Sequence, residues 1–462
     1  MIERPNHGRR SAIVLFWLAA ATLFGALVLG GGPGWRAEQL LIPPALLTIV
    51  MAVIRLVREP SLEPSQARLV WLLPLLLLSI PILQLIPLPG PVWTHLPGRV
   101  SLAVDLQGVL GDPGWRPLSL TPFQTEAALE LLCVPCAVYM AGMALPSDLR
   151  RRLLDMVLAV AAISALLGLL QVIQGPDSSL YFHAVTNRGY AVGLFANRSH
   201  LASFLASLLP VAIGMLMDRA RHVARTERDL RVWCLTALVI LLAVAATATR
   251  ARIGFVMLTL SAVAAILVAW RTRRRGGSGR RAQIWLRIGA LLALVLIVQY
   301  TLFAFLPRLE GGDPVDPRWR LARETVLLAT PVRGVGYGIG SYPRVHDLVG
   351  ASVADTRVYV NHAHDDYLEL WLEAGVPAVL LAAAAVAALV WQLLRQWRNL
   401  GRPPRPHDPS HDTHRALRFG ATFGLLLLAL HSAVDYPLRT LALESYAGLL
   451  VALVVRPRRR RT

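Results

Sequence analysis

The sequence contains no lysine, only 3 cysteines and few charged side chains. Charged residues make up 16% of the 462 positions, whereas a soluble domain carries about 25%. Three cysteines in so long a chain exclude a disulfide scaffold. The low charge and the 55% share of hydrophobic residues also exclude a disordered chain and a charge-rich nucleic-acid-binding protein. A membrane protein is the class that remains.

Long apolar runs recur along the whole chain, and each has about the length that crosses roughly 30 Å of hydrocarbon. They lie at 11–30, 38–56, 69–88, 127–145, 152–173, 199–217, 232–249, 252–270, 286–307, 376–395, 417–434 and 440–455. They predict an all-α membrane protein of about 12 transmembrane helices. No small-residue cleavage site follows the first run, which is therefore interpreted as an uncleaved anchor rather than a signal peptide.

The arginines set the orientation. The net charge of +19 comes from 47 basic residues, all arginine, against 28 acidic ones. With both termini in the cytoplasm, 32 arginines lie in the inner segments and 15 on the outer side. This distribution satisfies the positive-inside rule and predicts a topology with both ends inside. Binding to anionic membrane lipids is a secondary consequence.

The chain divides into three parts around one long outer segment. Residues 1–307 hold the first nine predicted helices, residues 308–375 form a large outer loop, and residues 376–462 hold the last three helices and a basic tail. The outer segments 89–126 and 174–198 are shorter. No internal repeat of the kind found in secondary transporters is evident.

The interiors of the predicted helices are nearly free of ionisable residues, which argues against a transport path. Cys133 and Cys136 have the spacing of a redox pair or half a metal site, but they stand alone among apolar neighbours. Two small side chains on a buried helix explain them more simply. No Walker motif is present, and the glycine run from Gly334 to Gly340 lacks the surroundings of a dinucleotide site.

The densest polar cluster of the sequence runs from Asn361 into the tenth predicted helix. Leu368, Trp371 and Leu372 recur at helical spacing, so the stretch from about Asp365 predicts an amphipathic helix on the membrane surface. His362, His364, Asp365 and Asp366 lie at its start. A metal site is one interpretation, although one short segment supplies only part of a ligand shell. A histidine general base oriented by a carboxylate is the alternative that needs fewer partners.

Further polar residues gather at the outer ends of other helices. Asn197 can cap the sixth helix beside Arg198 and Arg188, and helix N-termini favour anions. Arg250 and Arg252 lie in a tight outer turn, where snorkelling and phosphate binding are both open interpretations. His431 and Asp435 are spaced to share one helix face, where helix packing is the simpler interpretation. Together these residues suggest chemistry on a lipid-borne phosphate.

Five of these polar and glycine-rich segments make the sequence resemble the O-antigen ligase and polysaccharide polymerase superfamily. The motifs that carry the resemblance are Gly193-x-Phe195-x-Asn197-Arg198-x-His200, Thr249-Arg250, Arg333-Gly334-Val335-Gly336-Tyr337-Gly338, His364-x-x-Tyr367-Leu368 with Glu373-x-Gly375, and His431-x-x-x-Asp435-Tyr436-Pro437-Leu438. They occur in the family's order between about residue 70 and the end. Two departures stand out: Asp365 replaces the usual asparagine, and Ala251 replaces the usual glycine.

The resemblance implies a GT-C-type glycosyltransferase in the bacterial inner membrane, with no metal or other cofactor. It would transfer or polymerise a glycan from an undecaprenyl-pyrophosphate-linked donor onto a glycan or lipid acceptor at the periplasmic face. His364 would be the catalytic base, and Arg250 and Arg188 would bind the donor pyrophosphate. Further candidate donor ligands are Arg198, Arg318, Arg320 and Arg252, the last as a rival of Arg250. Candidate supporting residues are His362, Asp365, Asp366, Tyr367, Asn197, His431 and Asp435.

Two other function classes compete with this enzyme. A flippase of lipid-linked sugars also has about 12 helices, but it would place its arginines in a central cavity between two related halves. A sensor or scaffold would need no convergent histidines and arginines. The concentration of polar residues in the outer segments favours the enzyme, and no nucleic-acid partner is expected.

Overall fold

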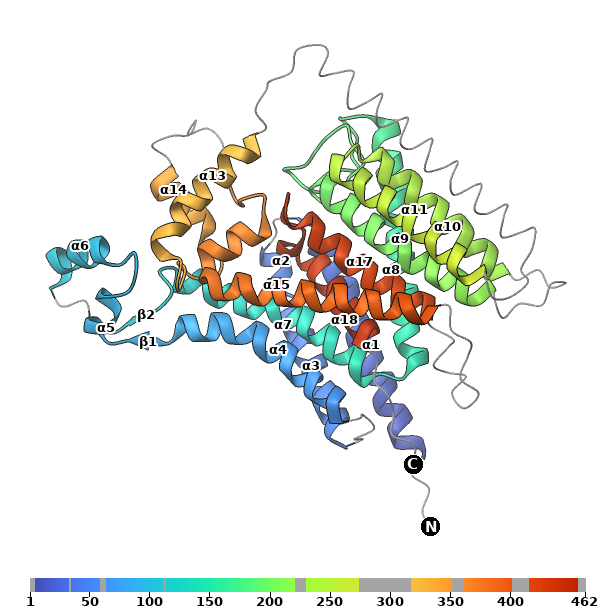
Figure 1. Cartoon of the computed structure of the whole chain (residues 1–462), viewed down its shortest axis with the longest axis horizontal. Helices are drawn as coiled ribbons and strands as arrows, with labels where there is room; N and C mark the ends of the chain where they lie inside the picture. The colour runs from blue at the N-terminus through green and yellow to red at the C-terminus, as the bar shows by residue number, and fades with distance from the viewer. Residues whose placement is uncertain are drawn as a thin grey trace.

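The computed structural model describes residues 5–32, 35–58, 64–111, 114–220, 230–273, 317–350, 360–400 and 415–455. Helices make up nearly all of the regular structure in these ranges (Figure 1). In chain order the elements are α1 (Pro5–Leu29), α2 (Trp35–Gln39), α3 (Ile42–Arg58), α4 (Pro64–Leu85), β1 (Pro87–Leu88), α5 (Gly90–Thr94), α6 (Val100–Leu110), β2 (Arg116–Pro117), α7 (Pro122–Ala144), α8 (Ser147–Gln174), α9 (Arg198–Ala220), α10 (Leu230–Ala248), α11 (Arg252–Arg273), α13 (Pro317–Ala329), η1 (Thr330–Val332), α14 (Tyr342–Gly350), α15 (Asp366–Leu400), α17 (Arg415–His431), η2 (Pro437–Arg439) and α18 (Leu441–Val455).

The helices confirm a multi-pass, all-α membrane protein. Within the described ranges, 8 helices are long and apolar enough to cross a membrane, and α11 and α18 contain shorter apolar stretches. Eleven of the twelve predicted spans coincide with helices, while the span predicted at 286–307 lies outside the described residues. The count of 12 and the orientation of both ends therefore stay predictions.

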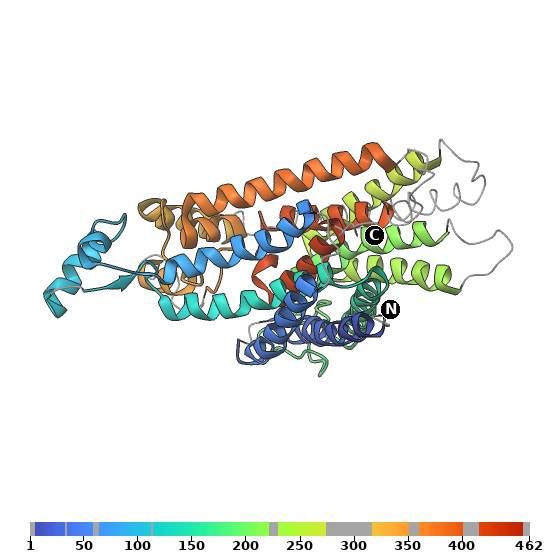
Figure 2. The ribbon, with the colours of Figure 1, turned by 90° about the horizontal axis from the view of Figure 1, so that it is seen from below.

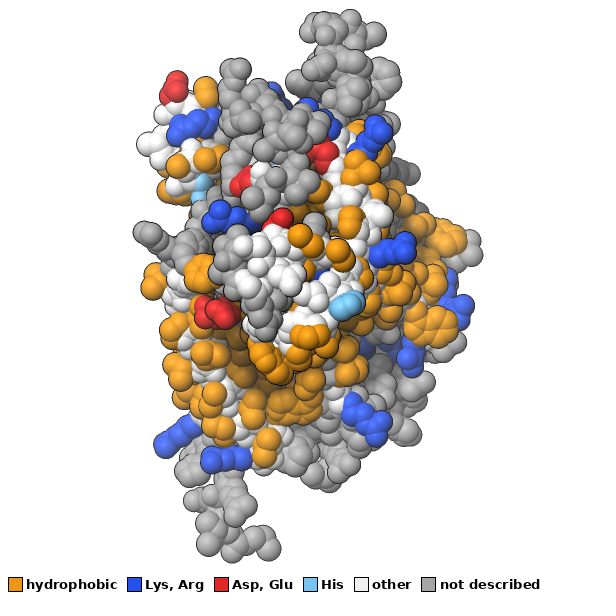
Figure 3. All heavy atoms as spheres, turned by 90° about the vertical axis from the view of Figure 1, so that its left-hand side faces the viewer, with side chains coloured by type: hydrophobic (Ala, Val, Ile, Leu, Met, Phe, Trp, Pro, Cys, Tyr) orange, Lys and Arg blue, Asp and Glu red, His pale blue; other side chains and the backbone are white. Residues whose placement is uncertain are grey.

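Large hydrophobic side chains are exposed along the flanks of the helices. Trp17, Val57, Leu75 and Trp391 are each about two-thirds exposed, at 66%, 67%, 66% and 65%. Figure 3 views the molecule from the left-hand end of Figure 1 and shows broad hydrophobic areas with scattered arginines. A soluble monomer does not expose so much apolar surface, so the acyl chains of a bilayer are its natural solvent.

Helices α9 and α17 pack at unusually close range. Gly420 and Gly424 of α17 face Pro210 and Ser207 of α9, and a Cβ atom on either glycine would clash with the α9 backbone. Small residues four apart allow helix backbones to approach one another within a membrane. The contact aligns the end of α17, at His431, with the first turns of α9.

Helix α15, from Asp366 to Leu400, is divided where the sequence predicts a boundary. A helix from about Asp365 and a separate span from residue 376 were expected, and non-helical backbone at Gly375 (φ 74°, ψ 179°) separates two helical parts at a kink. The burial of the first part, in contrast, differs from the expected surface helix. Asp366, Glu369 and Glu373 lie on one face of the first part and are buried. The acidic face therefore points into the protein instead of toward water.

The glycine run predicted to be a turn packs against this kink. Backbone N–H groups of Tyr337 and Gly338 donate to the carbonyls of Leu372 and Glu373, at 2.9 Å each. Gly336 and Gly338 have positive φ values of 71° and 117°, which glycine adopts without strain. A side chain at Gly336 would overlap the Glu373 carbonyl. The run is thus a close-packed turn that supports the start of α15.

The segment between α4 and α7 forms an arm at the left-hand end of the molecule (Figure 2). Strands β1 and β2 pair antiparallel at its base, and α5 and α6 extend beyond them. Arg99 is fully buried there, and its Nη2 donates to the carbonyls of Leu118 (2.6 Å) and Gly336 (3.4 Å). These bonds tie the arm to the glycine turn.

Candidate functional site

His364 and Asp435 form a hydrogen-bonded pair between two segments far apart in the sequence. His364 precedes α15, Asp435 lies in the turn after α17, and His364 Nδ1 is 3.1 Å from Asp435 Oδ1. The histidine side chain is 26% exposed, whereas the carboxylate is fully buried. With Nδ1 bound to the carboxylate, Nε2 is the nitrogen that remains to accept a proton from a bound molecule.

Asp435 lies in a site built to keep it ionised. Its second oxygen is 3.4 Å from Arg318 Nη2 and 3.7 Å from His431 Nε2, while the Tyr436 backbone N–H donates to Oδ1 at 3.0 Å. Burial alone would raise the pKa of Asp435. The hydrogen bond from His364 and the nearby His431 imidazole hold that pKa well below its usual value. The carboxylate can therefore orient a histidine without taking its proton.

His431 is fixed from its other side by α9. Its Nδ1 forms a very short hydrogen bond with Ser203 Oγ, and both side chains are fully buried. The close packing of α9 on α17 makes this bond possible. The predicted proximity of His431 and Asp435 is confirmed, although α17 ends at His431 and a turn carries Asp435.

Tyr436 is surrounded by three histidines. The His362 ring stacks on it with a centroid distance of 4.2 Å, and the rings of His364 and His200 meet its edge at 4.9 and 4.8 Å. Asn197, just before α9, lies close to Tyr436, and burial raises the pKa of the Tyr436 phenol to about 12. Tyr436 is thus a neutral platform that joins the first turn of α9 to the histidine segment.

Arg439 joins the acidic face of α15 to the turn that carries Asp435. Its Nη1 lies 2.5 Å from Glu373 Oε2 and 3.6 Å from Glu369 Oε1, and its Nε lies 3.7 Å from Asp366 Oδ1. Burial alone would lower the pKa of Arg439, but the three carboxylates raise it above its usual value. Glu373 also accepts the Gly340 N–H at 2.9 Å. One guanidinium therefore connects η2, α15 and the glycine turn.

Backbone strain marks two residues of the described part of the chain. There, only Arg250 (φ 52°) and His364 (φ 55°) combine a positive φ with a residue other than glycine. The left-handed conformation costs roughly 1–2 kcal/mol for such residues. Strain of this kind concentrates at functional sites. Both residues are motif positions on which the sequence prediction rests.

We expect Arg250→Gly to separate stability from activity. Arg250 follows α10 at a position where glycine is the common helix-ending residue. The glycine variant should unfold at the same temperature as the wild type or at a higher one. Its free energy of unfolding should rise by up to about 1 kcal/mol, because the backbone strain disappears. If the guanidinium binds the donor pyrophosphate as the sequence predicts, the predicted glycan transfer should fall by about 10²–10³-fold.

Thermal unfolding and transfer rate of Arg250→Gly and Arg252→Gly, measured side by side, decide between the two rivals. Arg252 opens α11 with ordinary helical backbone, so its glycine variant should show no gain in stability. Full activity in Arg250→Gly with loss in Arg252→Gly would assign the phosphate to Arg252 instead.

The predicted donor arginines differ in their position relative to the histidine cluster. Arg318 contacts Asp435 directly, whereas the Arg198 guanidinium lies over the Tyr190 ring, 4.0 Å from its centroid. Arg250 lies in the turn between α10 and α11, Arg252 opens α11, and Gly254 of α11 packs on Ala202, in the first turns of α9.

Arg188 and Arg320 are held by local partners. Arg188 donates to the Pro176 carbonyl at 3.1 Å and lies over the Tyr181 ring. Arg320 pairs with Glu324 at 3.8 Å and is 57% exposed. These contacts give both arginines a structural role within their own segments, and their part in donor binding stays a prediction.

The predicted supporting residues divide into two groups. Asp365 caps α15, because its Oδ1 accepts the backbone N–H groups of Tyr367 (2.9 Å) and Leu368 (3.0 Å). The Tyr367 hydroxyl donates to the Ala429 carbonyl at 2.7 Å and so ties α15 to α17. These two residues therefore hold the helix in place, as does Asp366, which accepts the Ser432 hydroxyl and faces Arg439. His362, His431, Asp435 and Asn197 belong to the histidine cluster itself.

Sequence reasoning missed the parts of the site that depend on pairing between segments. Ser203, His200, Glu369 and Arg439 were not singled out as site residues, although the structure places all of them around the cluster. The spacing of Asp366, Glu369 and Glu373 on one helix face was a usable signal. A buried basic partner would have been the expected complement to such a face.

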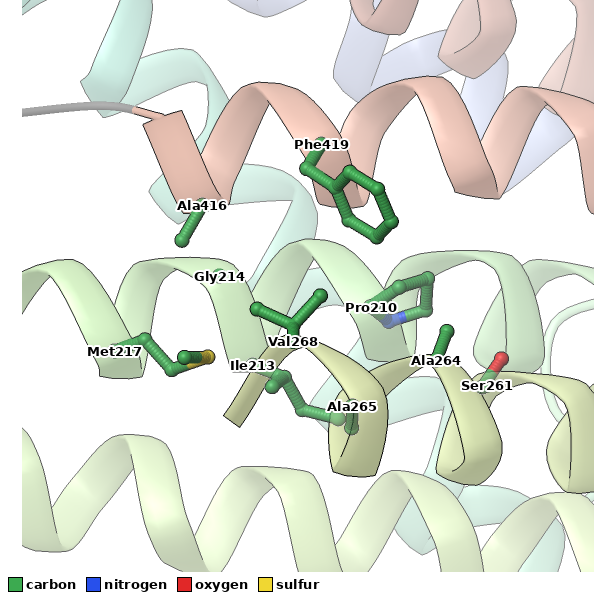
Figure 4. A pocket seen from close by; sticks show the side chains of 10 residues that line it. All are labelled: Pro210, Ile213, Gly214, Met217, Ser261, Ala264, Ala265, Val268, Ala416 and Phe419. Carbon is green, nitrogen blue, oxygen red and sulfur yellow. The ribbon is translucent and has the colours of Figure 1, made fainter. Parts of the chain in front are cut away.

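A small crevice elsewhere in the structure does not compete with this site. It lies between α9, α11 and α17 (Figure 4). Its lining residues are Pro210, Ile213, Gly214, Met217, Ser261, Ala264, Ala265, Val268, Ala416 and Phe419. The Ser261 hydroxyl bonds to backbone carbonyls of its own helix and of α9. None of the lining side chains is titratable, so the crevice offers no group for proton transfer.

Comparison with known proteins matches part of the chain to one protein family. The family model of the O-antigen ligases matches residues 236–383, a range that contains Arg250 and His364. No curated protein matches the chain.

Proposed function

We propose that the protein transfers or polymerises a glycan from an undecaprenyl-pyrophosphate-linked donor onto an acceptor hydroxyl, at the periplasmic face of the bacterial inner membrane. Two findings support this proposal: the similarity of residues 236–383 to the O-antigen ligases, which agrees with the resemblance of the sequence motifs, and the geometry of the site. The observation that carries the proposal is the His364–Asp435 pair, in which a partly exposed imidazole is oriented by a buried, ionised carboxylate.

His364 Nε2 takes the proton of the acceptor hydroxyl as that oxygen attacks the anomeric carbon of the donor sugar. The bond from the sugar to the pyrophosphate oxygen breaks, and lipid pyrophosphate leaves. Asp435 holds the imidazole in the tautomer that has Nε2 free, and it stabilises the imidazolium that forms. Energy comes from the activated donor, so the reaction needs no nucleotide.

The arginines of the outer ends stabilise the leaving pyrophosphate. Arg318 contacts Asp435, the Arg198 guanidinium at the start of α9 lies over the Tyr190 ring, and Arg250 and Arg252 lie close in sequence to Gly254, which packs on Ala202 of α9. Guanidinium groups keep their charge and fit phosphate oxygens as forks. The lipid tail of the donor would lie against the apolar flanks of the helices. Arg188 and Arg320 would extend the donor site at its edge.

A flippase of the same lipids is the second candidate function, and the arrangement of charges favours the enzyme over it. Histidines and buried carboxylates that contact one another gather around the strained His364, where the segments at the ends of α15 and α17 meet. A transport path would instead place ionisable side chains within the bundle along the whole membrane depth. Catalysis at one membrane face accounts for the clustering.

The proposal can be tested with purified protein in nanodiscs. The donor substrate is the lipid-linked oligosaccharide that accumulates in cells lacking the gene. Addition of membranes that carry the acceptor should release undecaprenyl pyrophosphate and form a new glycan product in equal amounts. EDTA should leave this rate unchanged, because the proposed machinery consists of histidine, carboxylate and arginine side chains. Movement of intact donor across vesicle bilayers without release of pyrophosphate would support the flippase instead.

A further inference from the structure

A second carboxylate-bound histidine lies beside the first. His362 Nδ1 is 2.9 Å from Glu369 Oε1, and the other oxygen of Glu369 accepts the Ala363 N–H at 2.9 Å. The histidine side chain is 23% exposed, while the carboxylate is 1% exposed. The arrangement repeats that of His364 and Asp435, with an open imidazole on a buried acid.

Both imidazoles belong to one site because they share Tyr436. His362 stacks on the face of the phenol ring, and His364 meets the edge, each with ring centroids less than 5 Å from it. Since both Nδ1 atoms are bound to carboxylates, Nε2 is the atom that each ring offers to a bound molecule. A histidine needed only for packing would not require a buried carboxylate on its inner nitrogen.

The charged surroundings of the two histidines differ. Glu369 is shared between His362 and Arg439, and Arg439 also contacts Asp366 and Glu373. The other titratable groups that face His362 are Tyr436, which stacks on it, and His200 on α9. Asp435, in contrast, is shared among His364, His431 and Arg318. Different environments for neighbouring titratable groups are typical of acid and base pairs.

We propose that His362 is a second catalytic residue, the general acid of the transfer. This inference rests on the proposed function. As the acceptor oxygen attacks, His364 takes its proton, and His362 Nε2 gives a proton to the pyrophosphate oxygen whose bond to the sugar breaks. One proton is taken up and one is released, so the two histidines end the step with exchanged charges. Proton exchange with solvent restores them.

The test is the pH dependence of transfer in right-side-out spheroplasts, where the external buffer reaches the periplasmic face directly. Endogenous lipid-linked donor and acceptor serve as substrates, and pulse-labelled sugar reports the rate. Wild-type protein should show a bell-shaped profile, whose acid limb reports the base and whose alkaline limb reports the acid. His362→Gln should lower the maximal rate by about 10²-fold and remove the alkaline limb.

His364→Gln should remove the acid limb instead, and Glu369→Gln should displace the alkaline limb. His95→Gln, an exposed histidine on the arm, is the matched control and should keep the wild-type profile. Size-exclusion profiles and melting temperatures of the purified variants exclude misfolding as the cause of a lost limb.

Two results would overturn the assignment of His362. An unchanged bell-shaped pH–rate profile in His362→Gln contradicts it. A uniformly lower rate that retains both limbs of the profile also contradicts it, because that result would indicate a structural role. In either case loss of transfer in His364→Gln would leave the proposed function standing. Normal transfer in both variants would reject the proposed function itself.

Discussion

Replacing His364 by alanine should reduce glycan transfer by about 10²–10⁴-fold, the usual contribution of a general base. The imidazole is the only part of the His364–Asp435 pair that is open to a bound molecule, because the carboxylate is fully buried. The chain length of surface glycan in a complemented deletion strain, and the release of lipid pyrophosphate in nanodiscs, both measure the effect.

The alanine variant should fold, since the side chain makes few contacts beyond Asp435 and the edge of Tyr436. Membrane insertion and a sharp size-exclusion peak check this expectation. His95→Ala controls for the loss of a histidine at the same end of the molecule. Wild-type glycan in cells that carry His364→Ala would reject the mechanism.

Asp435→Asn should reproduce much of this loss without changing the shape of the site. The amide can donate to Nδ1 and so stabilise the tautomer in which Nε2 carries the hydrogen and cannot accept one. The effects of His364→Ala and Asp435→Asn should not add in the double variant, because the two side chains act as a unit. Additive losses would separate their roles.

Acidification should not inactivate the enzyme through Asp435. The pKa of this carboxyl is held well below its usual value, so Asp435 stays ionised where exposed carboxyls begin to take up protons. Stability contributed by Asp435 is present above the pKa of the unfolded chain and is lost only as pH falls through the depressed folded value. A reversible acid limb near neutral pH would therefore belong to a histidine.

Arg439→Met should destabilise the protein by about 3–5 kcal/mol, because it leaves buried carboxylates without their counter-charge. Glu373, Glu369 and Asp366 all lie within 3.7 Å of the guanidinium, and Glu373 is fully buried. Thermal unfolding in detergent, followed by intrinsic tryptophan fluorescence, should show a lower midpoint and a lower yield of monodisperse protein.

A charge-neutral partner should restore part of this loss. Glu373→Gln in the Arg439→Met background removes one uncompensated charge and keeps an oxygen to accept the Gly340 N–H. Arg415→Met, at the start of α17 and at the opposite end of that helix, is a matched control with a smaller expected effect. Failure of the second substitution to raise the midpoint would show that packing, and not charge, is what Arg439 supplies.

Much of the fold follows from local properties of the chain. A membrane span can be predicted from its own sequence without knowledge of its neighbours, because each apolar run must cross the hydrocarbon layer as a helix. The described helices therefore lie where the sequence predicts spans. The start of α15 is the exception, since alternation of apolar and polar residues cannot tell which face meets protein. There the acidic face is buried because it pairs with Arg439 of η2. This partner lies 66 positions after Glu373, so local sequence does not reveal it.

The histidine proposed as the base and the arginines proposed as donor ligands were candidates from motifs alone, whereas the contacts that build the site could not be predicted. Asp435 was assigned only a supporting role, and Tyr436 drew no role beyond its motif. The structure places them against His364 because α17 packs on α9 through glycines, and the turn after α17 meets the segment before α15. Contacts of this kind join residues more than 70 positions apart.

The sequence by itself determined that the chain is an apolar, multi-pass helical protein, because hydrophobicity acts locally, and it predicted clusters of polar residues in the segments between the helices. Only the tertiary structure decided which of those polar residues meet. It joined each of two histidines to a buried carboxylate, brought three carboxylates to one arginine, and bent the backbone of Arg250 and His364 into a strained conformation. Such outcomes depend on distances between distant segments, which packing alone sets.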